Sequence, residues 1–154
     1  MSTWVDPATV TTGTQGVLVR SAAATIAADK DLFSINTGRI QLLGFMGHVT
    51  VAIGGGSQDF VINFDPDDGG SNLALASLVA VDADATGTYY TLNTTFGGAL
   101  VATLDYAPNF ILIDGGFTLG LGDIALDTTG AEAGSVEWDL VYAPIDAGAN
   151  VTAV

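Results

Sequence analysis

The chain of 154 residues contains no cysteine. This absence excludes a disulfide scaffold, a catalytic thiolate and a zinc site built on thiolates. A chain of this length is the size of one domain and can bury enough apolar surface to fold without cross-links. We therefore expect one domain whose stability comes from packing.

Basic residues are almost as scarce. Arg20, Lys30 and Arg39 are the only cations beside seventeen acidic residues, and the formal net charge is −14. Affinity for nucleic acid comes largely from Lys and Arg side chains that neutralise phosphates. This composition excludes nucleic acid as the main ligand.

Long apolar runs are missing as well. No window reaches the about 18 uninterrupted apolar residues of a membrane span, and the first residues lack the basic and apolar regions of a signal peptide. We expect no membrane partner, and synthesis and folding in a cytoplasm.

Side chains that perform catalysis are few. A serine nucleophile needs a histidine as its base, and His48 is the single histidine of the chain. Serines stand in two glycine-rich turns, "GGGSQ" (54–58) and "DGGSN" (68–72), but there is no second histidine that could support a triad. Two aspartates could still hydrolyse a glycoside, so a hydrolase of that kind stays an alternative. We expect no enzyme and no cofactor.

Aspartate accounts for fifteen of the acidic residues and lies mostly beside Gly, Pro, Thr and Ala. In such places its side chain bonds to nearby backbone in turns. Two segments, "DPDDGG" (65–70) and "VDADATG" (81–87), also resemble half of a calcium-binding loop, but the twelfth position of neither is acidic. Turn chemistry is favoured, with calcium as the alternative at Asp65, Asp67, Asp82 and Asp84.

Short runs of alternating or apolar residues, separated by turn residues, follow one another along the chain. They predict strands over 31–36, 39–53, 58–65, 73–81, 88–93, 99–106, 109–113, 117–121, 123–127, 135–144 and 150–154. The segment 73–81 also fits a helical stripe, although a strand is favoured. The fold class is therefore all-β, an antiparallel β-sandwich of jelly-roll or Greek-key type with about ten short strands.

Alternation assigns the faces of three strands. The inward residues are predicted to be Val136, Trp138, Leu140 and Tyr142 in the last long strand, Phe60, Ile62 and Phe64 in 58–65, and Val49, Val51 and Ile53 in 39–53. His48 then points outward, and Glu137 and Asp139 form an acidic outer face that is expected to contact water. Gly44 and Gly47 are expected at bulges or kinks.

Residues 1–30 are rich in Thr, Ala and Ser and have only isolated apolar residues. We interpret them as an N-terminal arm or extended segment that precedes a sandwich domain over 31–154. A large aromatic residue near a polar terminus is a common interface anchor. We therefore predict that the contacts with a capsid or another subunit are made by Trp4, Val5, Pro7, Val10, Val17 and Val19. The alternative is that Trp4 folds back on its own domain.

From residue 31 to the C-terminus the chain resembles small virion proteins of tailed phages, which we place with the capsid decoration or cement proteins. The resemblance rests on "DLFSINTGRIQLLGFMGHVTVAI" (31–53), "LVAVDADATGTYYTLN" (78–93), "GALV" (98–101) and the ending "GSVEWDLVYAPIDAGANVTAV" (134–154). The ending is the most specific part, with its apolar strand, tyrosine, Pro-x-Asp and hydrophobic tail.

The resemblance implies a β-sandwich on the outer surface of a capsid, with no cofactor and no active site. Its expected partners are the major capsid protein and other copies of the chain, as a dimer or trimer. A carbohydrate-binding or adhesin-like module of a virion spike is the alternative, because β-sandwiches serve both roles.

Overall fold

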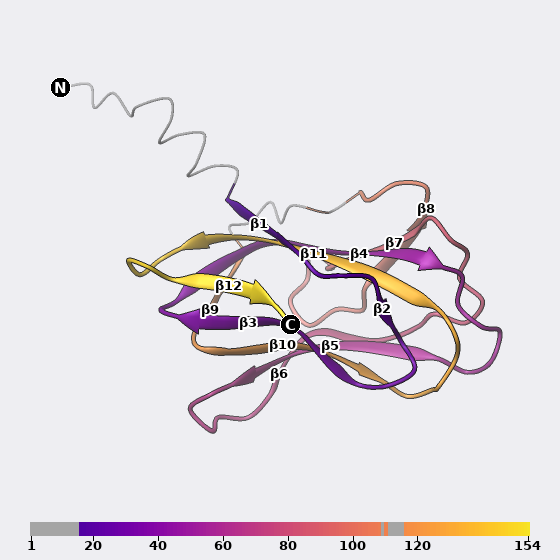
Figure 1. Cartoon of the computed structure of the whole chain (residues 1–154), viewed down its shortest axis with the longest axis horizontal. Helices are drawn as coiled ribbons and strands as arrows, with labels where there is room; N and C mark the ends of the chain where they lie inside the picture. Colours follow the sequence, from indigo (N-terminus) through magenta and orange to yellow (C-terminus); the bar gives the residue numbers. More distant parts are fainter. Residues whose placement is uncertain (1–15, 109, 111–115) are drawn as a thin grey trace.

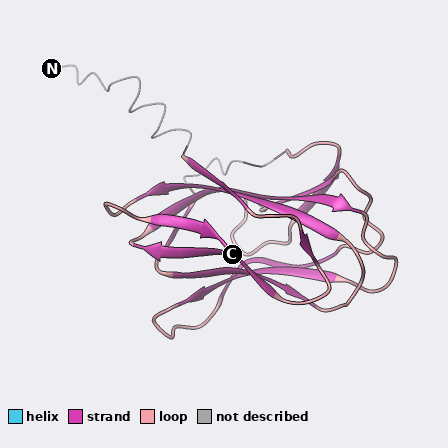
Figure 2. Cartoon of the chain, viewed as in Figure 1, coloured by secondary structure: helices cyan, strands magenta, loops and turns pink. Residues whose placement is uncertain are grey.

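The computed structural model describes residues 16–108, 110 and 116–154, and every regular element among them is a β-strand (Figures 1 and 2). The strands are β1 (Val17–Arg20), β2 (Ala24–Thr25), β3 (Lys30–Thr37), β4 (Ile40–Val51), β5 (Asp59–Pro66), β6 (Leu73–Ala80), β7 (Thr88–Thr91), β8 (Val101–Leu104), β9 (Phe117–Leu119), β10 (Gly122–Thr128), β11 (Ser135–Pro144) and β12 (Asn150–Ala153).

The strands form two antiparallel sheets that face each other as a sandwich (Figure 1). Sheet A has the order β1-β11-β4-β7-β8, with β2 beside β11 and β9 beside β4, and sheet B has the order β12-β3-β10-β5-β6. Most connections pass from one sheet to the other. The predicted all-β sandwich is confirmed, including the strand at 73–81; the jelly-roll or Greek-key connection stays a prediction, and 109–113 lies outside the described residues except for 110.

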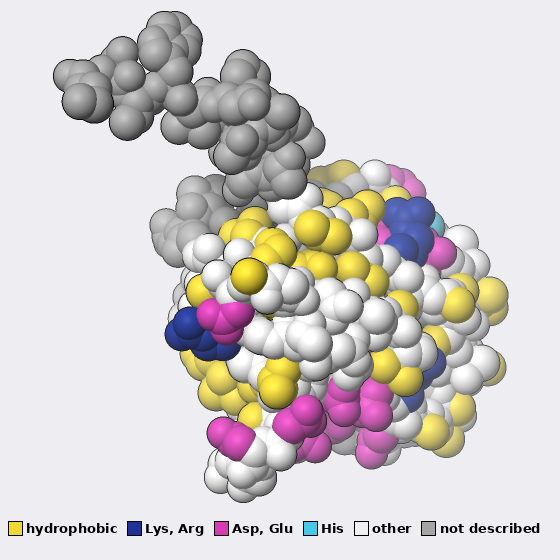
Figure 3. Space-filling view, turned by 60° about the vertical axis from the view of Figure 1, so that its left-hand side comes forward, with side chains coloured by type: hydrophobic (Ala, Val, Ile, Leu, Met, Phe, Trp, Pro, Cys, Tyr) yellow, Lys and Arg dark blue, Asp and Glu magenta, His cyan; other side chains and the backbone are white. Residues whose placement is uncertain are grey.

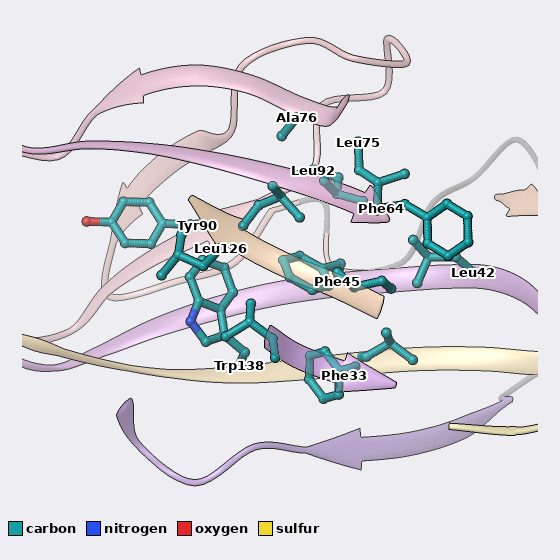
Figure 4. Close-up of a cluster of buried hydrophobic side chains, with 14 of the residues drawn as sticks. Phe33, Leu42, Phe45, Phe64, Leu75, Ala76, Tyr90, Leu92, Leu126 and Trp138 are labelled. Carbon is teal, nitrogen blue, oxygen red and sulfur yellow. The ribbon is translucent and has the colours of Figure 1, made fainter. Parts of the chain in front are cut away.

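The core fills the space between the sheets with the inward residues of both (Figure 4). At its centre the Trp138 ring lies 5.2 Å from the Phe45 ring and 6.4 Å from the Tyr90 ring, measured between centroids. All three side chains are fully buried. The predicted inward faces of β5 and β11 are confirmed, since each of their seven residues is at most 6% exposed.

The predicted inward orientation is wrong for one residue of β4. Val51 is 55% exposed, whereas Val49 and Ile53 are buried as expected. The pairing of β4 with β11 shifts here, because Val136 faces Val49 and the preceding residue of β11, Ser135, faces Val51. Thr50 is therefore the extra residue of a bulge, which turns Val51, the last residue of β4, to the outer face, while Ile53 lies beyond the end of the strand.

The two glycines of β4 have different roles. Leu43 is the extra residue of a second bulge, beside Gly44, as the prediction of a bulge there suggested. Gly47 lies in regular pairing opposite Trp138, so the predicted irregularity is wrong at this position. A Cβ atom on Gly47 would lie 2.6 Å from the Trp138 ring, which explains the need for glycine.

Candidate interaction surface

Four connections between strands meet at one end of the sandwich. They are the connections β3–β4, β5–β6, β9–β10 and β11–β12, and the register brings them together: Ile40 pairs with both Pro144 and Leu119, and Gly122 pairs with both Pro66 and Ile35. The start of β1 lies at the same end, because Val17 pairs with Tyr142. Figure 3 shows the molecule with this end turned forward.

Large apolar side chains are exposed at this end, where turn residues would ordinarily be polar. Leu121 stands between two glycines, and Ile145 between a proline and an aspartate, so turn chemistry explains neither. Exposed apolar patches mark interaction sites, and Figure 3 shows hydrophobic side chains gathered on this face. We call this surface the apolar end and define it by Val17, Leu18, Leu73, Leu121 and Ile145, which are 39–55% exposed.

An ion pair fastens β1 to the sandwich. Arg20 donates from Nε to Asp139 Oδ1 at 2.6 Å and from Nη2 to Asp139 Oδ2 at 2.8 Å, and its Nε also lies 3.4 Å from Glu137 Oε1. These hydrogen bonds and the two negative charges raise the pKa of Arg20. The expectation that Asp139 contacts water is therefore wrong: the residue is 4% exposed because Arg20, its partner in the β1–β11 register, covers it.

The predicted contact residues fall in two groups. Trp4, Val5, Pro7 and Val10 lie outside the described residues. Val17 and Val19 are both on β1, where Val17 is exposed and Val19 packs against the core. Leu18, which the sequence did not reveal as a contact residue, is 55% exposed and thus more exposed than Val17 at 39%.

A second ion pair holds two connections of the apolar end together. Arg39, between β3 and β4, donates from Nε to Asp146 Oδ2 at 3.0 Å and from Nη2 to Asp146 Oδ1 at 2.8 Å. The backbone N–H of Arg39 also donates to Asp146 Oδ2 at 2.8 Å. These hydrogen bonds lower the pKa of Asp146 to about 2. The connection that carries Ile145 is thus fixed in place.

The aspartates of 81–87 belong to the opposite end, where they bind the protein's own groups. Asp82 Oδ1 accepts the backbone N–H of Gln58 at 2.5 Å, and Asp84 Oδ2 accepts the Tyr90 hydroxyl at 2.6 Å. Burial, followed by this hydrogen bond, raises the pKa of Tyr90.

The other predicted calcium residues, Asp65 and Asp67, are exposed near the apolar end. Within residues 16–108, 110 and 116–154, no three His, Asp or Glu side chains form a group that could hold a metal ion.

His48 lies on the outer face of sheet A, as predicted. Its ring stacks on that of Tyr89, with 4.5 Å between the centroids. Its cross-strand neighbours are Tyr89 and Glu137, and neither is a serine or a cysteine that a histidine could activate. The arrangement supports a packing role for this histidine.

No protein-family model, no curated protein and no solved structure matches the chain. No helix that could cross a membrane occurs in the part of the chain described above.

Proposed function

We propose that this protein is a structural component of a virion, which binds the outer surface of a phage capsid in many copies and stabilises the shell without a catalytic role. One observation carries the proposal: five of the eleven exposed large hydrophobic side chains among the described residues lie at one end of the sandwich, while the outer face of sheet B is acidic. The resemblance to decoration proteins supports the same role.

The acidic face is made by outward positions on three neighbouring strands. Asp123 stands directly opposite Asp65 in the β10–β5 pairing, and like charges in that position cost stability. This pair therefore does not stabilise the sheet, and a concentrated negative face repels other molecules of the same charge. The strand aspartates of this face are Asp31, Asp59, Asp65, Asp123 and Asp127.

The apolar end is suited to contact with another protein. Burial of an exposed leucine side chain contributes about 1.5–3 kcal/mol when it is complete, and Leu18 is already ordered by its pairing with Val141. Fixing such a residue in advance lowers the entropy cost of binding. On a symmetric shell the same contact is repeated many times, so a modest affinity per copy stabilises the whole particle.

The test is a pair of matched substitutions. Leu18 and Val51 are both 55% exposed on strands of sheet A, but Leu18 pairs with Val141 and Val51 with Ser135, six positions away along β11. We expect L18D to prevent co-sedimentation with capsids that lack the wild-type protein. V51D is expected to bind these capsids normally, because it adds the same charge at the opposite end.

The heat resistance of the particles gives the second measurement. Capsids loaded with the wild-type protein or with V51D should withstand a higher temperature than capsids loaded with L18D. Equal binding by L18D and V51D would contradict the assignment of the apolar end. No binding by the wild-type protein would refute the proposed function, and binding to a glycan array instead would favour the carbohydrate-binding alternative.

A further inference from the structure

The apolar end contains a cleft of about 480 Å³ between the β5–β6 and β9–β10 connections. Its apolar walls are Phe64, Pro66 and Leu121, and Asp67 and Asp68 lie at its rim. The two connections are joined by the backbone N–H of Asp67, which donates to the Leu121 carbonyl oxygen at 3.1 Å. This hydrogen bond links the two connections beside the cleft, and the size of the cleft falls within the range of about 300–1,000 Å³ that is common for binding pockets.

The carboxylates of the rim have no cation of their own. In the described part of the chain, the ion pairs within 4.0 Å are made by Arg20, with Asp139 and Glu137, and by Arg39, with Asp146. Asp68 Oδ1 accepts one hydrogen bond, from the backbone N–H of Gly70 at 2.9 Å. The negative charge at the mouth of the cleft is thus not neutralised by a Lys or Arg of the described residues and can attract a cationic group of a partner.

We infer that this cleft receives a lysine or arginine side chain of the protein to which the apolar end binds. Such a side chain has an apolar stem, which packs on apolar walls, and a charged head, which reaches polar groups at the rim. Phe64 and Leu121 fit the stem, and Asp67 and Asp68 fit the head. This inference rests on the proposed function, because it names the chemistry of the partner at the same surface.

A second copy of the chain is a poor donor of this cation. Two of its three cations, Arg20 and Arg39, are engaged in the ion pairs described above. The third, Lys30, is half-buried on β3 and pairs with Leu126 within sheet B. The net charge of −14 also opposes the approach of another copy to an acidic rim. The occupant is therefore a different protein, with a basic residue at the contact.

The first test uses the isolated full-length protein and needs no capsid. N-acetyl-lysine methylamide and N-acetyl-arginine methylamide are titrated while backbone amide shifts are followed by NMR, with N-acetyl-norleucine methylamide as the uncharged control. We expect saturable shifts at residues 64–68 and 120–122 for the two cations only. These shifts should be lost in D67N/D68N and kept in D31N/D105N, which removes the same charge elsewhere. Shifts of equal size with norleucine, or none at the cleft, would overturn the inference.

The second test measures binding to capsids. D67N/D68N should bind about 3- to 10-fold more weakly than D31N/D105N, which is the expected effect of two exposed ion pairs. G120F should weaken binding as well, because Gly120 lines the cleft and a Cβ atom there meets nothing within 4 Å, so a phenyl ring can be added beside the cleft without a clash. If all these variants bind like the wild-type protein while L18D does not, the inference fails and the proposed function stands. If the wild-type protein binds no capsid, the proposed function fails, and the NMR titration still decides whether the cleft takes a cation.

Discussion

The substitution Gly47→Ala tests the packing at the centre of the sandwich. A Cβ atom at this position would lie 2.6, 2.8 and 2.9 Å from three atoms of the Trp138 ring, whereas carbon atoms pack best at about 3.5–4.0 Å. The ring cannot move aside easily, because Trp138 is fully buried among the rings of Phe45, Phe60 and Tyr90. Overpacking of this kind costs about 1–3 kcal/mol.

The matched control is Gly55→Ala, since a Cβ atom on Gly55 meets nothing within 4 Å. Any Gly→Ala change also restricts the unfolded chain, which stabilises the protein by about 0.4–1 kcal/mol where the native backbone accepts alanine. This contribution is common to both variants, so the difference between their unfolding free energies measures the overpacking alone. We expect Gly47→Ala to be the less stable variant by about 1–3 kcal/mol.

Denaturant unfolding in a Trp4→Phe background measures this difference, because Trp138 is then the only tryptophan that reports on the fold. The melting temperature should fall by about 2–4 °C for each kcal/mol in a chain of this size. Equal stability of Gly47→Ala and Gly55→Ala would show that Trp138 does not pack against Gly47, and the register of β4 against β11 would have to be revised.

Two further predictions concern the two ends of the sandwich. Asp146→Asn should destabilise the protein near neutral pH, because it removes the carboxylate that Arg39 binds. The folded-state pKa of Asp146 is about 2, below the ordinary value of 3.8. In an acid unfolding series, the stability difference from wild type should therefore be complete above pH 4 and vanish as the pH falls through 2. A difference that persists below pH 2 would contradict this assignment. Gln58→Leu should lower the unfolding free energy by about 1–3 kcal/mol, because the buried Gln58 accepts the backbone N–H of Glu132 at 3.1 Å and donates to the Ile26 carbonyl oxygen at 3.5 Å. Urea unfolding checks this value, and a loss below about 0.5 kcal/mol would show that these loops do not depend on Gln58.

Alternation in the sequence was sufficient to place the strands and most of the core. It identified the buried faces of β5 and β11, because side chains two positions apart share a face and one face of each sheet is buried. It failed at Val51, since the bulge at Thr50 is set by the register between β4 and β11 and no glycine marks it in the sequence, in contrast to the bulge beside Gly44. It also failed at Asp139, whose cover, Arg20, lies 119 positions earlier in the chain.

The apolar end could be predicted only in part. Val17 was identified from its place near the N-terminus, but Leu121 and Ile145 lie in connections that are far apart in the sequence. A leucine between two glycines, or an isoleucine between proline and aspartate, is not needed to form a turn. Such a residue therefore indicates an additional role, such as contact with another molecule. That such residues lie close together follows from strand pairing, which the pattern of one strand does not contain.

Under the proposed function, the positions of charge and apolar surface limit how the molecule would bind a capsid. Contact through sheet B would bring the five strand aspartates against the partner and would leave the apolar end in water. Contact through the apolar end buries Leu18, Leu121 and Ile145 and leaves the acidic face beside the contact, exposed to solvent. The strands connect the apolar end with the opposite end of the sandwich, so their axes would point away from the partner's surface. The connection that contains Gln58, at the opposite end, would then be farthest from that surface. Neighbouring copies would then face one another through the sides of their sandwiches, where the acidic face of sheet B opposes aggregation.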